Sequence, residues 1–257
     1  YEIGVRLVGS EMCIRDSPIT HRNRQVVAGH RFVIECTGSP NDAVTFDSEF
    51  IATGSRKRIK DVVRFGISGI DGGMIVTKKR EKNKDETGAL IDYGYVGDIS
   101  SVNMDILNTQ LDAGYIPIIS SLTANTDGVI LNVNADTIAA TIAYELSAEK
   151  LILMTSVPGI LMDTNDKTSL ISYINHDSLK KMKSNGKLTD GMLPKADAIG
   201  LALDNGVSRV HIISSNSEDS LLTEIFTNHG TGTLIVKDLT NLTTKEQLGE
   251  SNEATVG

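Results

Sequence analysis

Two stretches of the chain combine side chains that can hold a phosphorylated ligand. In the first, Asn132, Asn134 and Asp136 occupy alternate positions, and in the second Lys195 directly follows Pro194. Alternate side chains of an extended segment point to the same side, so Asn132 and Asn134 are expected to face one ligand together. Asp136 falls in the first turn of an expected helix, where the helix dipole favours a carboxylate. Helix capping, for which Asn and Asp are preferred, is the alternative for these residues taken alone.

Lys195 stands at the start of a second expected helix. Pro194 suits the opening turn of that helix, and Gly206 lies beyond its expected end. Helix N-termini disfavour cations. A lysine there is therefore useful mainly when an anion binds, and phosphate is the usual one. The alternative is an exposed surface lysine, which is what most lysines are.

The overall composition narrows the class of protein. The 257 residues carry a formal net charge of −8, which argues against nucleic acid or an anionic membrane as the main partner. No apolar run is long enough to span a bilayer, and the N-terminus lacks the residue order of a signal peptide. Cys13 and Cys36 give neither a disulfide framework nor a metal-site spacing, so we expect no protein metal site and a reducing cytoplasm.

The expected elements would place both stretches at one edge of a sheet. The pattern predicts strands at residues 115–119, 150–155, 210–213 and 230–236. It predicts helices at residues 100–113, 135–146, 175–183, 194–203 and 219–226. This alternation predicts an α/β fold with a mostly parallel open sheet and helices on both faces. Ligands then bind at the carboxyl ends of the strands, where both stretches fall.

The two ends of the chain are expected to lie outside the folded domain. The run Glu11–Ser17 resembles a translated transposon end of the kind used in sequencing-library preparation. We therefore predict that residues 1–17 are foreign and disordered, with a genuine N-terminal extension as the alternative. Residues 238–257 are polar without a periodic apolar face and are predicted to be disordered. The domain is expected at residues 18–237, in two parts at about 18–150 and about 151–237.

The order of these motifs resembles the acetylglutamate kinases of the amino-acid-kinase family over roughly residues 64–236. The resemblance implies a three-layer sandwich in which Lys195 stabilises the transferred phosphoryl group and Asp136 positions that lysine. Asp136 need not act as a base, because an acceptor carboxylate is already ionised at pH 7. Asn132 and Asn134 would bind the substrate. Arg31, in Gly29-His30-Arg31, would clamp its α-carboxylate.

Further segments resemble the nucleotide side and the regulatory part of the family. Nucleotide contacts are implied for Ser156, Val157, Pro158, Gly159, Ile160 and Leu161, and for Lys187, Leu188 and Thr189. An ordinary connection is the alternative, because Pro-Gly marks turns generally. Asp98 lies in a segment similar to a turn beside the acyl pocket, and an N-terminal helix cap is the alternative for it. Glu224 with Gly230–Thr233 resembles the C-terminal stretch of arginine-regulated members.

The resemblance implies ATP-dependent phosphorylation of the side-chain carboxylate of N-acetyl-L-glutamate in arginine biosynthesis, with Mg²⁺ on the nucleotide. It also implies a homo-oligomer, a dimer or a hexamer, and arginine as a feedback inhibitor. The family's first strand and its Lys-x-Gly-Gly turn are not found, since the first Gly-Gly is Gly72-Gly73. The activity of this chain by itself is therefore left open. The alternatives are a sibling kinase with another carboxylate or phosphate acceptor, and a non-catalytic arginine-sensing module.

Overall fold

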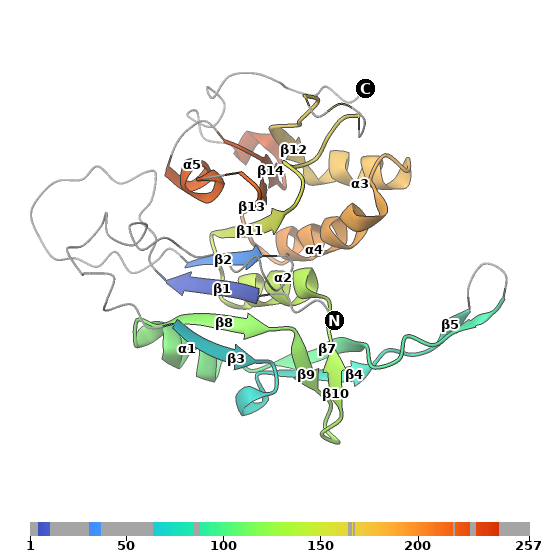
Figure 1. The fold of residues 1–257 in the computed structure, drawn as a ribbon, viewed down its shortest axis with the longest axis vertical. Coiled ribbons are helices and arrows are strands. Elements are labelled where there is room, and N and C mark those ends of the chain that lie inside the picture. The colour runs from blue at the N-terminus through green and yellow to red at the C-terminus, as the bar shows by residue number, and fades with distance from the viewer. Residues whose placement is uncertain are drawn as a thin grey trace, which may run out of the picture.

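A computed structural model describes residues 5–10, 31–36, 64–84, 88–163, 166, 168–217, 219–226 and 230–241. Within these ranges the chain forms an eight-stranded sheet, a four-stranded sheet and a two-stranded ribbon (Figure 1). No helix in the described part of the chain is long and apolar enough to cross a membrane.

The eight-stranded sheet forms the centre of the fold. Its spatial order is β12 (Tyr173–Asn175), β14 (Thr233–Val236), β13 (Arg209–Ser214), β11 (Lys150–Thr155), β2 (Arg31–Cys36), β1 (Val5–Ser10), β8 (Ile116–Ser120) and β3 (Arg64–Ser68). Four pairings are parallel and three are antiparallel. The prediction of a mostly parallel sheet is confirmed. The antiparallel pairings are those of β1 with both of its neighbours and of β14 with β13.

Helices cover both faces of this sheet. They are α1 (Asp105–Asp112), α2 (Ala135–Glu145), α3 (His176–Ser184), α4 (Leu193–Asp204) and α5 (Ser220–Phe226). Figure 1 shows α3 and α4 on one side of β11, β13 and β14, and α5 on the other. The expected α/β layers are therefore confirmed, and α2 to α5 begin and end within one residue of the predicted bounds.

The core is made where α2 and α4 pack on each other and on the sheet. Ile138 and Ile142 of α2, Ile199 of α4, and Leu151 and Leu153 of β11 are all fully buried in one cluster. Burial of each such side chain contributes about 1.5–3 kcal/mol to folding. The helices that carry the two candidate stretches are therefore fixed against each other by apolar packing.

The four-stranded sheet lies beside the larger one and has the order β10 (Ile130–Asn132), β9 (Leu122–Ala124), β4 (Ile75–Lys79) and β7 (Gly97–Val102). The ribbon of β5 (Asn83–Lys84) and β6 (Leu90–Ile91) extends from it. Residues 100–102, predicted to open a helix, instead belong to β7. Ser101 and Val102 pair with β4, and at the register shift the hydroxyl of Ser100 donates to the Val76 carbonyl at 2.9 Å. The helix prediction at 100–113 is therefore wrong at its start, because this pairing satisfies the backbone that a helix would otherwise use.

The ends of the chain differ from the sequence expectations in part. Val5–Ser10 form β1 in a segment predicted to be foreign and disordered, and the origin of that segment stays a prediction. The C-terminal tail is described only as far as residue 241, and Leu239–Asn241 there form a 3₁₀ turn, η4. Gly29 and His30 lie outside the described residues.

Gly232, the residue before β14, lies directly against the backbone of the neighbouring strand β13. A β-carbon built on Gly232 would lie 1.9 Å from the Ile212 carbonyl oxygen, far inside any real contact. Because the obstacle is backbone in the centre of the sheet, it cannot move aside without breaking the β13–β14 pairing.

We expect Gly232→Ala to lower the free energy of unfolding by at least about 1–3 kcal/mol, which is the usual cost of forcing extra atoms into a packed interior. Urea denaturation measures this change. Gly66→Ala is the control, since a β-carbon on Gly66 would meet nothing within 4 Å. An equal loss of stability in both variants would contradict the assignment of the effect to close backbone contact.

Candidate functional site

A buried ion pair joins the first turns of α2 and α4. The Lys195 ammonium donates to Asp136 Oδ1 at 2.6 Å, and the two side chains are 9% and 8% exposed. Because α2 leads into β11 and α4 leads into β13, and each helix packs on its strand, both helices begin at the carboxyl edge of those strands. The structure therefore brings Lys195 and Asp136 together at the edge where the sequence predicted a ligand.

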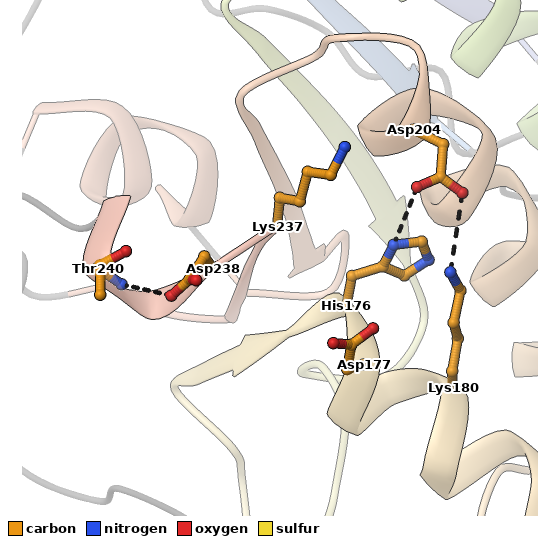
Figure 2. Close-up of a pocket in the computed structure, with 7 residues that line it drawn as sticks. All are labelled: His176, Asp177, Lys180, Asp204, Lys237, Asp238 and Thr240. Atoms are coloured by element: carbon orange, nitrogen blue, oxygen red, sulfur yellow. Dashed lines mark hydrogen bonds and ion pairs between the residues drawn. The ribbon is translucent and has the colours of Figure 1, made fainter.

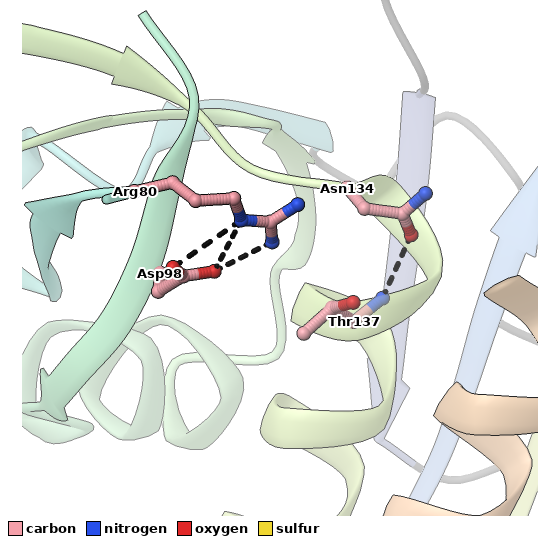
Figure 3. Close-up of polar contacts among 4 residues, drawn as sticks. All are labelled: Arg80, Asp98, Asn134 and Thr137. Carbon is pink, nitrogen blue, oxygen red and sulfur yellow. Dashed lines mark hydrogen bonds and ion pairs between the residues drawn. The ribbon is translucent and has the colours of Figure 1, made fainter. Parts of the chain in front are cut away.

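The start of α2 is fixed by Asn134, which caps the helix. Asn134 has extended backbone angles, and its side-chain oxygen accepts from the Thr137 amide at 3.1 Å (Figure 3). One of the free amides of the first turn is thereby satisfied. Asn134 is therefore a helix cap, as the alternative proposed. Capping does not exclude a ligand contact, because the residue is exposed at the site.

Asn132 lies on the same exposed side as Asn134, as alternation predicted. Leu131 and Val133 are buried between these two exposed asparagines. The Asn132 side-chain oxygen accepts from the Ser121 hydroxyl at 3.1 Å, and its backbone amide donates to the Tyr95 carbonyl at 2.8 Å. Asn132 is thus held through its side chain by Ser121, between β8 and β9, and through its backbone by Tyr95, before β7.

The loop after β11 carries the candidate nucleotide contacts Ser156–Leu161. Ser156 and Val157 are exposed, whereas Gly159 and Ile160 are buried. Gly159 admits no side chain, because a β-carbon there would lie 2.6 Å from Thr233 Oγ1. The Ile160 amide donates to the same hydroxyl at 2.9 Å. The loop is therefore anchored to β14 at its far end and open to solvent at its start.

The second candidate nucleotide segment connects α3 to α4. Lys187 and Thr189 are exposed, and Leu188 packs against the core. The Thr189 carbonyl accepts from the Met192 amide at 2.8 Å within the 3₁₀ turn η3 (Asp190–Met192) that leads into α4. This segment is therefore in a position to place Lys195, and nucleotide contact by it stays a prediction.

Arg31 lies away from the other candidates. It is the first residue of β2, and its neighbour Phe32 pairs with Lys150 at the start of the parallel strand β11. Its backbone therefore sits at the amino edge of the sheet, whereas Ser156 follows the carboxyl edge. The structure does not bring Arg31 to the site, and a role for it in substrate binding stays a prediction.

A different arginine, Arg80, lies beside the asparagine pair. Its guanidinium forms a bidentate ion pair with Asp98, with Nε and Nη2 at 3.0 and 2.5 Å from Oδ1, and the hydrogen bond to Asp98 raises the Arg80 pKa. The Arg80 amide donates to the Val96 carbonyl, and Val96 bridges to Asn132. Figure 3 shows the guanidinium extending toward Asn134. Asp98 belongs to β7 and is not a helix cap.

Arg80 was missed because it lies within a charged run that the sequence presents as a solvated tip. Its one distinguishing signal is the opposite charge of Asp98, eighteen residues later. The pairing of these two residues depends on the β4–β7 register, in which Lys79 lies opposite Gly97.

A polar hollow of about 600 Å³ lies at the opposite edge of the sheet (Figure 2). His176 Nδ1 lies 3.5 Å from Asp204, and Lys180 lies 3.8 Å from the same carboxylate. The pKa of the His176 imidazole is lowered, chiefly because burial disfavours its charged form, with Lys180 and Lys237 adding repulsion. Asp177 and Asp238 complete the polar lining together with Thr240.

The residues described hold no cluster of three or more His, Cys, Asp or Glu side chains able to bind a metal ion. The site at the carboxyl edge is instead built from one cation paired with a carboxylate, two amides and an open loop. Such a set suits the binding of an anionic ligand whose charge Lys195 would face.

Comparison with known proteins places these features in a family. A model of the amino acid kinase family matches residues 59–214. The chain is 44% identical over 179 residues to an acetylglutamate kinase from Myxococcus xanthus, a match that covers 67% of this chain and 58% of that protein. It is 45% identical over 173 residues to an acetylglutamate kinase from Thermoanaerobacter sp., covering 67% of this chain and 56% of that protein. The chain thus spans somewhat more than half the length of these curated relatives.

A solved structure has a similar fold. The chain superposes on N-acetylglutamate synthase from Neisseria gonorrhoeae, complexed with coenzyme A and N-acetyl-glutamate, with a TM-score of 0.59 at 25% identity. The similarity covers 74% of this chain and 43% of the synthase.

The buried ion pair predicts a distinctive pattern of stabilities. We expect Asp136→Asn to lower the free energy of unfolding by about 3–5 kcal/mol, because it leaves a buried ammonium without its counter-charge. The double variant Asp136→Leu/Lys195→Met removes both charges and is expected to lose much less. Urea denaturation of the single and double variants measures the coupling. A double variant less stable than Asp136→Asn would contradict this account.

The lowered pKa of His176 predicts acid sensitivity. Above the ordinary histidine pKa of about 6.5, the His176 imidazole is neutral in both the folded and the unfolded protein, and its contribution to stability is fully present. As the pH falls through this value toward the lowered folded pKa, the unfolded state takes up the proton first and stability is lost. We expect the drop in unfolding free energy between pH 8 and pH 5 to be smaller in His176→Asn than in the wild type. An equal drop would exclude His176 as its source.

Proposed function

This chain belongs to the amino acid kinase family, and from that premise we propose that the protein transfers the γ-phosphoryl group of ATP to the side-chain carboxylate of N-acetyl-L-glutamate. The reaction would serve arginine biosynthesis. The observation that carries the proposal is the buried contact between Lys195 and Asp136 at the carboxyl edge of the sheet. The identity of 44–45% to acetylglutamate kinases supports the choice of acceptor.

The proposed chemistry needs charge neutralisation more than proton transfer. A carboxylate oxygen of the acceptor attacks the γ-phosphorus, the bond between that phosphorus and the β–γ bridging oxygen breaks, and ADP leaves with the electron pair. The acceptor is already ionised at pH 7, so no base is required. Positioning and electrostatic stabilisation then supply the catalysis.

Lys195 would stabilise the charge that spreads over the transferred phosphoryl group. Its partner Asp136 holds the ammonium at a fixed place, because their contact of 2.6 Å joins two helices of the core. Pre-positioned charges are effective because they need no reorganisation during the reaction. Mg²⁺ would supply further neutralisation when bound to the nucleotide phosphates.

The two sides of the site would bind different ligands. Asn132 and Asn134 would present their amides to the acceptor, and Figure 3 shows the Arg80 guanidinium extending toward Asn134. The loop Ser156–Leu161, with Lys187–Thr189, would contact the nucleotide. An acceptor between the amides and a nucleotide at the loop would meet at Lys195.

The two alternatives make different demands on these residues. Position 134 discriminates against a sibling kinase. The aminoadipate-carrier kinases, for instance, tend to have an acid there, whereas the Asn134 of this chain favours acetylglutamate. An arginine-sensing module without catalysis would not need a buried lysine beside a nucleotide loop. The ion pair of Lys195 with Asp136 favours the kinase.

The wider setting of the protein follows from the proposed reaction. A biosynthetic kinase that uses ATP would work in the cytoplasm. Assembly into a dimer or a hexamer, and inhibition by arginine, are further predictions that the resemblance motivates. The stretch that resembles arginine-regulated members includes Glu224, whose carboxylate accepts from the Thr231 amide at 2.7 Å.

With the Lys-x-Gly-Gly strand restored at its N-terminus, the protein is expected to release ADP from ATP and Mg²⁺ only when N-acetyl-L-glutamate is present. The product is expected to be an acyl phosphate that hydroxylamine traps as a hydroxamate. Lys195→Met is expected to lower kcat by about 100- to 1000-fold, the usual loss when a group that stabilises transition-state charge is removed. Lys181→Met, which removes an exposed lysine of α3, is the control and should retain activity. Turnover only with a different acid would refute the assignment.

A further inference from the structure

The loop after β13 is tied to the candidate nucleotide loop by side chains that the sequence did not single out. The amide and the hydroxyl of Ser215 both donate to the Thr155 carbonyl, at 2.7 and 3.1 Å. The side-chain amide of Asn216 donates to the Ser156 carbonyl at 3.1 Å. Because β11 and β13 are parallel and Thr155 pairs with Ser214, the two loops leave the sheet at the same edge. Asn216 therefore reaches the first residue of the nucleotide loop.

Further hydrogen bonds hold the backbone of Asn216 in place. Its backbone amide donates to the Ser214 hydroxyl at 3.1 Å, and the Ser214 carbonyl accepts from the buried Ser220 hydroxyl at 2.6 Å. The Ser220 carbonyl in turn accepts from the Thr231 hydroxyl at 3.2 Å. These contacts connect the loop to the start of α5 and to the turn that enters β14.

This chain of contacts ends on a buried pair in the interior. Glu224 Oε2 accepts from the Thr231 amide at 2.7 Å, and Glu224 Oε1 lies 2.7 Å from His211 Nδ1. Glu224 and His211 are only 5% and 3% exposed. Buried polar contacts of this kind fix geometry, because breaking one leaves a polar atom without water or a partner. The loop after β13 is thus connected through hydrogen bonds to a buried pair whose geometry is fixed.

These hydrogen bonds fix the orientation of the candidate nucleotide loop. The carbonyls of Thr155 and Ser156 are turned toward the β13 loop by their donors, while Ser156 and Val157 stay exposed. At the other end of the loop the Ile160 amide is bound to the Thr233 hydroxyl. A loop held at both ends presents its remaining exposed groups in one orientation, which lowers the entropy lost on binding.

We propose that Asn216 is a positioning residue for the nucleotide: its side-chain amide holds the Ser156 carbonyl, and so fixes the loop Ser156–Leu161 in the orientation that binds the nucleotide. Asn216 acts through the loop and needs no contact with the reacting atoms. The inference rests on the proposed function, and it assigns to Asn216 an effect on nucleotide affinity but not on the chemical step.

The test compares ADP binding by the protein with its Lys-x-Gly-Gly strand restored, taken as the wild type, and by two variants of it. Binding is measured by isothermal titration with Mg²⁺ present. Asn216→Ala removes the donor without adding a charge, and we expect it to weaken ADP binding roughly three- to tenfold, the usual range for one neutral hydrogen bond. Ser217→Ala is the matched control, because Ser217 is the next exposed residue and its recorded contact is made by its backbone carbonyl. It should bind ADP like the wild type.

Kinetic measurements separate positioning from a general loss of structure. For Asn216→Ala we expect a raised KM for ATP, with kcat at saturating ATP and KM for N-acetyl-L-glutamate within about twofold of the wild type. Hydrogen exchange of the backbone amides of Val157, Gly159 and Ile160 should be faster in this variant than in Ser217→Ala. A merely structural defect would instead lower kcat and raise both KM values together.

The outcomes distinguish this inference from the proposed function. Equal ADP affinity of Asn216→Ala and the wild type overturns the inference and leaves the proposed function intact. A wild type that binds no ADP overturns both. A loss of affinity shared by Ser217→Ala also overturns the inference, because it would show that the loop tolerates no substitution rather than that it needs this donor.

Discussion

The ion pair between Lys195 and Asp136 is the constraint on which the site depends. An ammonium and a carboxylate that are both less than a tenth exposed are costly to desolvate, and only a close, well-oriented contact compensates for that cost. The contact requires the first turns of α2 and α4 to meet, and the apolar packing of Ile138, Ile142 and Ile199 holds them there. The Lys195 ammonium, which we propose neutralises charge on a ligand, is thereby fixed before a ligand arrives.

The parallel pairing of β11 with β13 places two loops and the first turns of two helices at the same edge of the sheet. Strands β11 and β13 are parallel, so the loops that follow them leave the sheet side by side and can be joined by Ser215 and Asn216. The helices that return to these strands begin at the same edge and carry Asp136 and Lys195. The pair of Lys195 and Asp136 thus depends on helix packing, whereas the candidate nucleotide loop depends on contacts between loops.

How far the sequence predicted the fold can be judged element by element. The helices with a cap or an opening proline were predicted closely, because Asn134 and Pro194 are local signals that tertiary contacts did not override. The continuous apolar run at 150–155 is the strand β11 as expected. The start of the helix predicted at Ser100 was wrong, because the residues that follow it pair with β4 and the Ser100 hydroxyl binds the Val76 carbonyl, twenty-four residues earlier. No local pattern reveals that partner. Arg31 was grouped with the site by a short motif, but the register of β2 places its backbone at the other edge.

The sequence by itself determined the family, the succession of helices and strands, and the residue types that could handle a phosphoryl group. These depend on local spacing and on preferences of single residues, which are present in the chain before it folds. Only the tertiary structure decided which of those residues meet: it joined Lys195 to Asp136, paired Arg80 with Asp98, and bonded Asn216 to the candidate nucleotide loop. Contacts between residues sixty positions apart are set by strand register and helix packing, which arise from the whole chain at once.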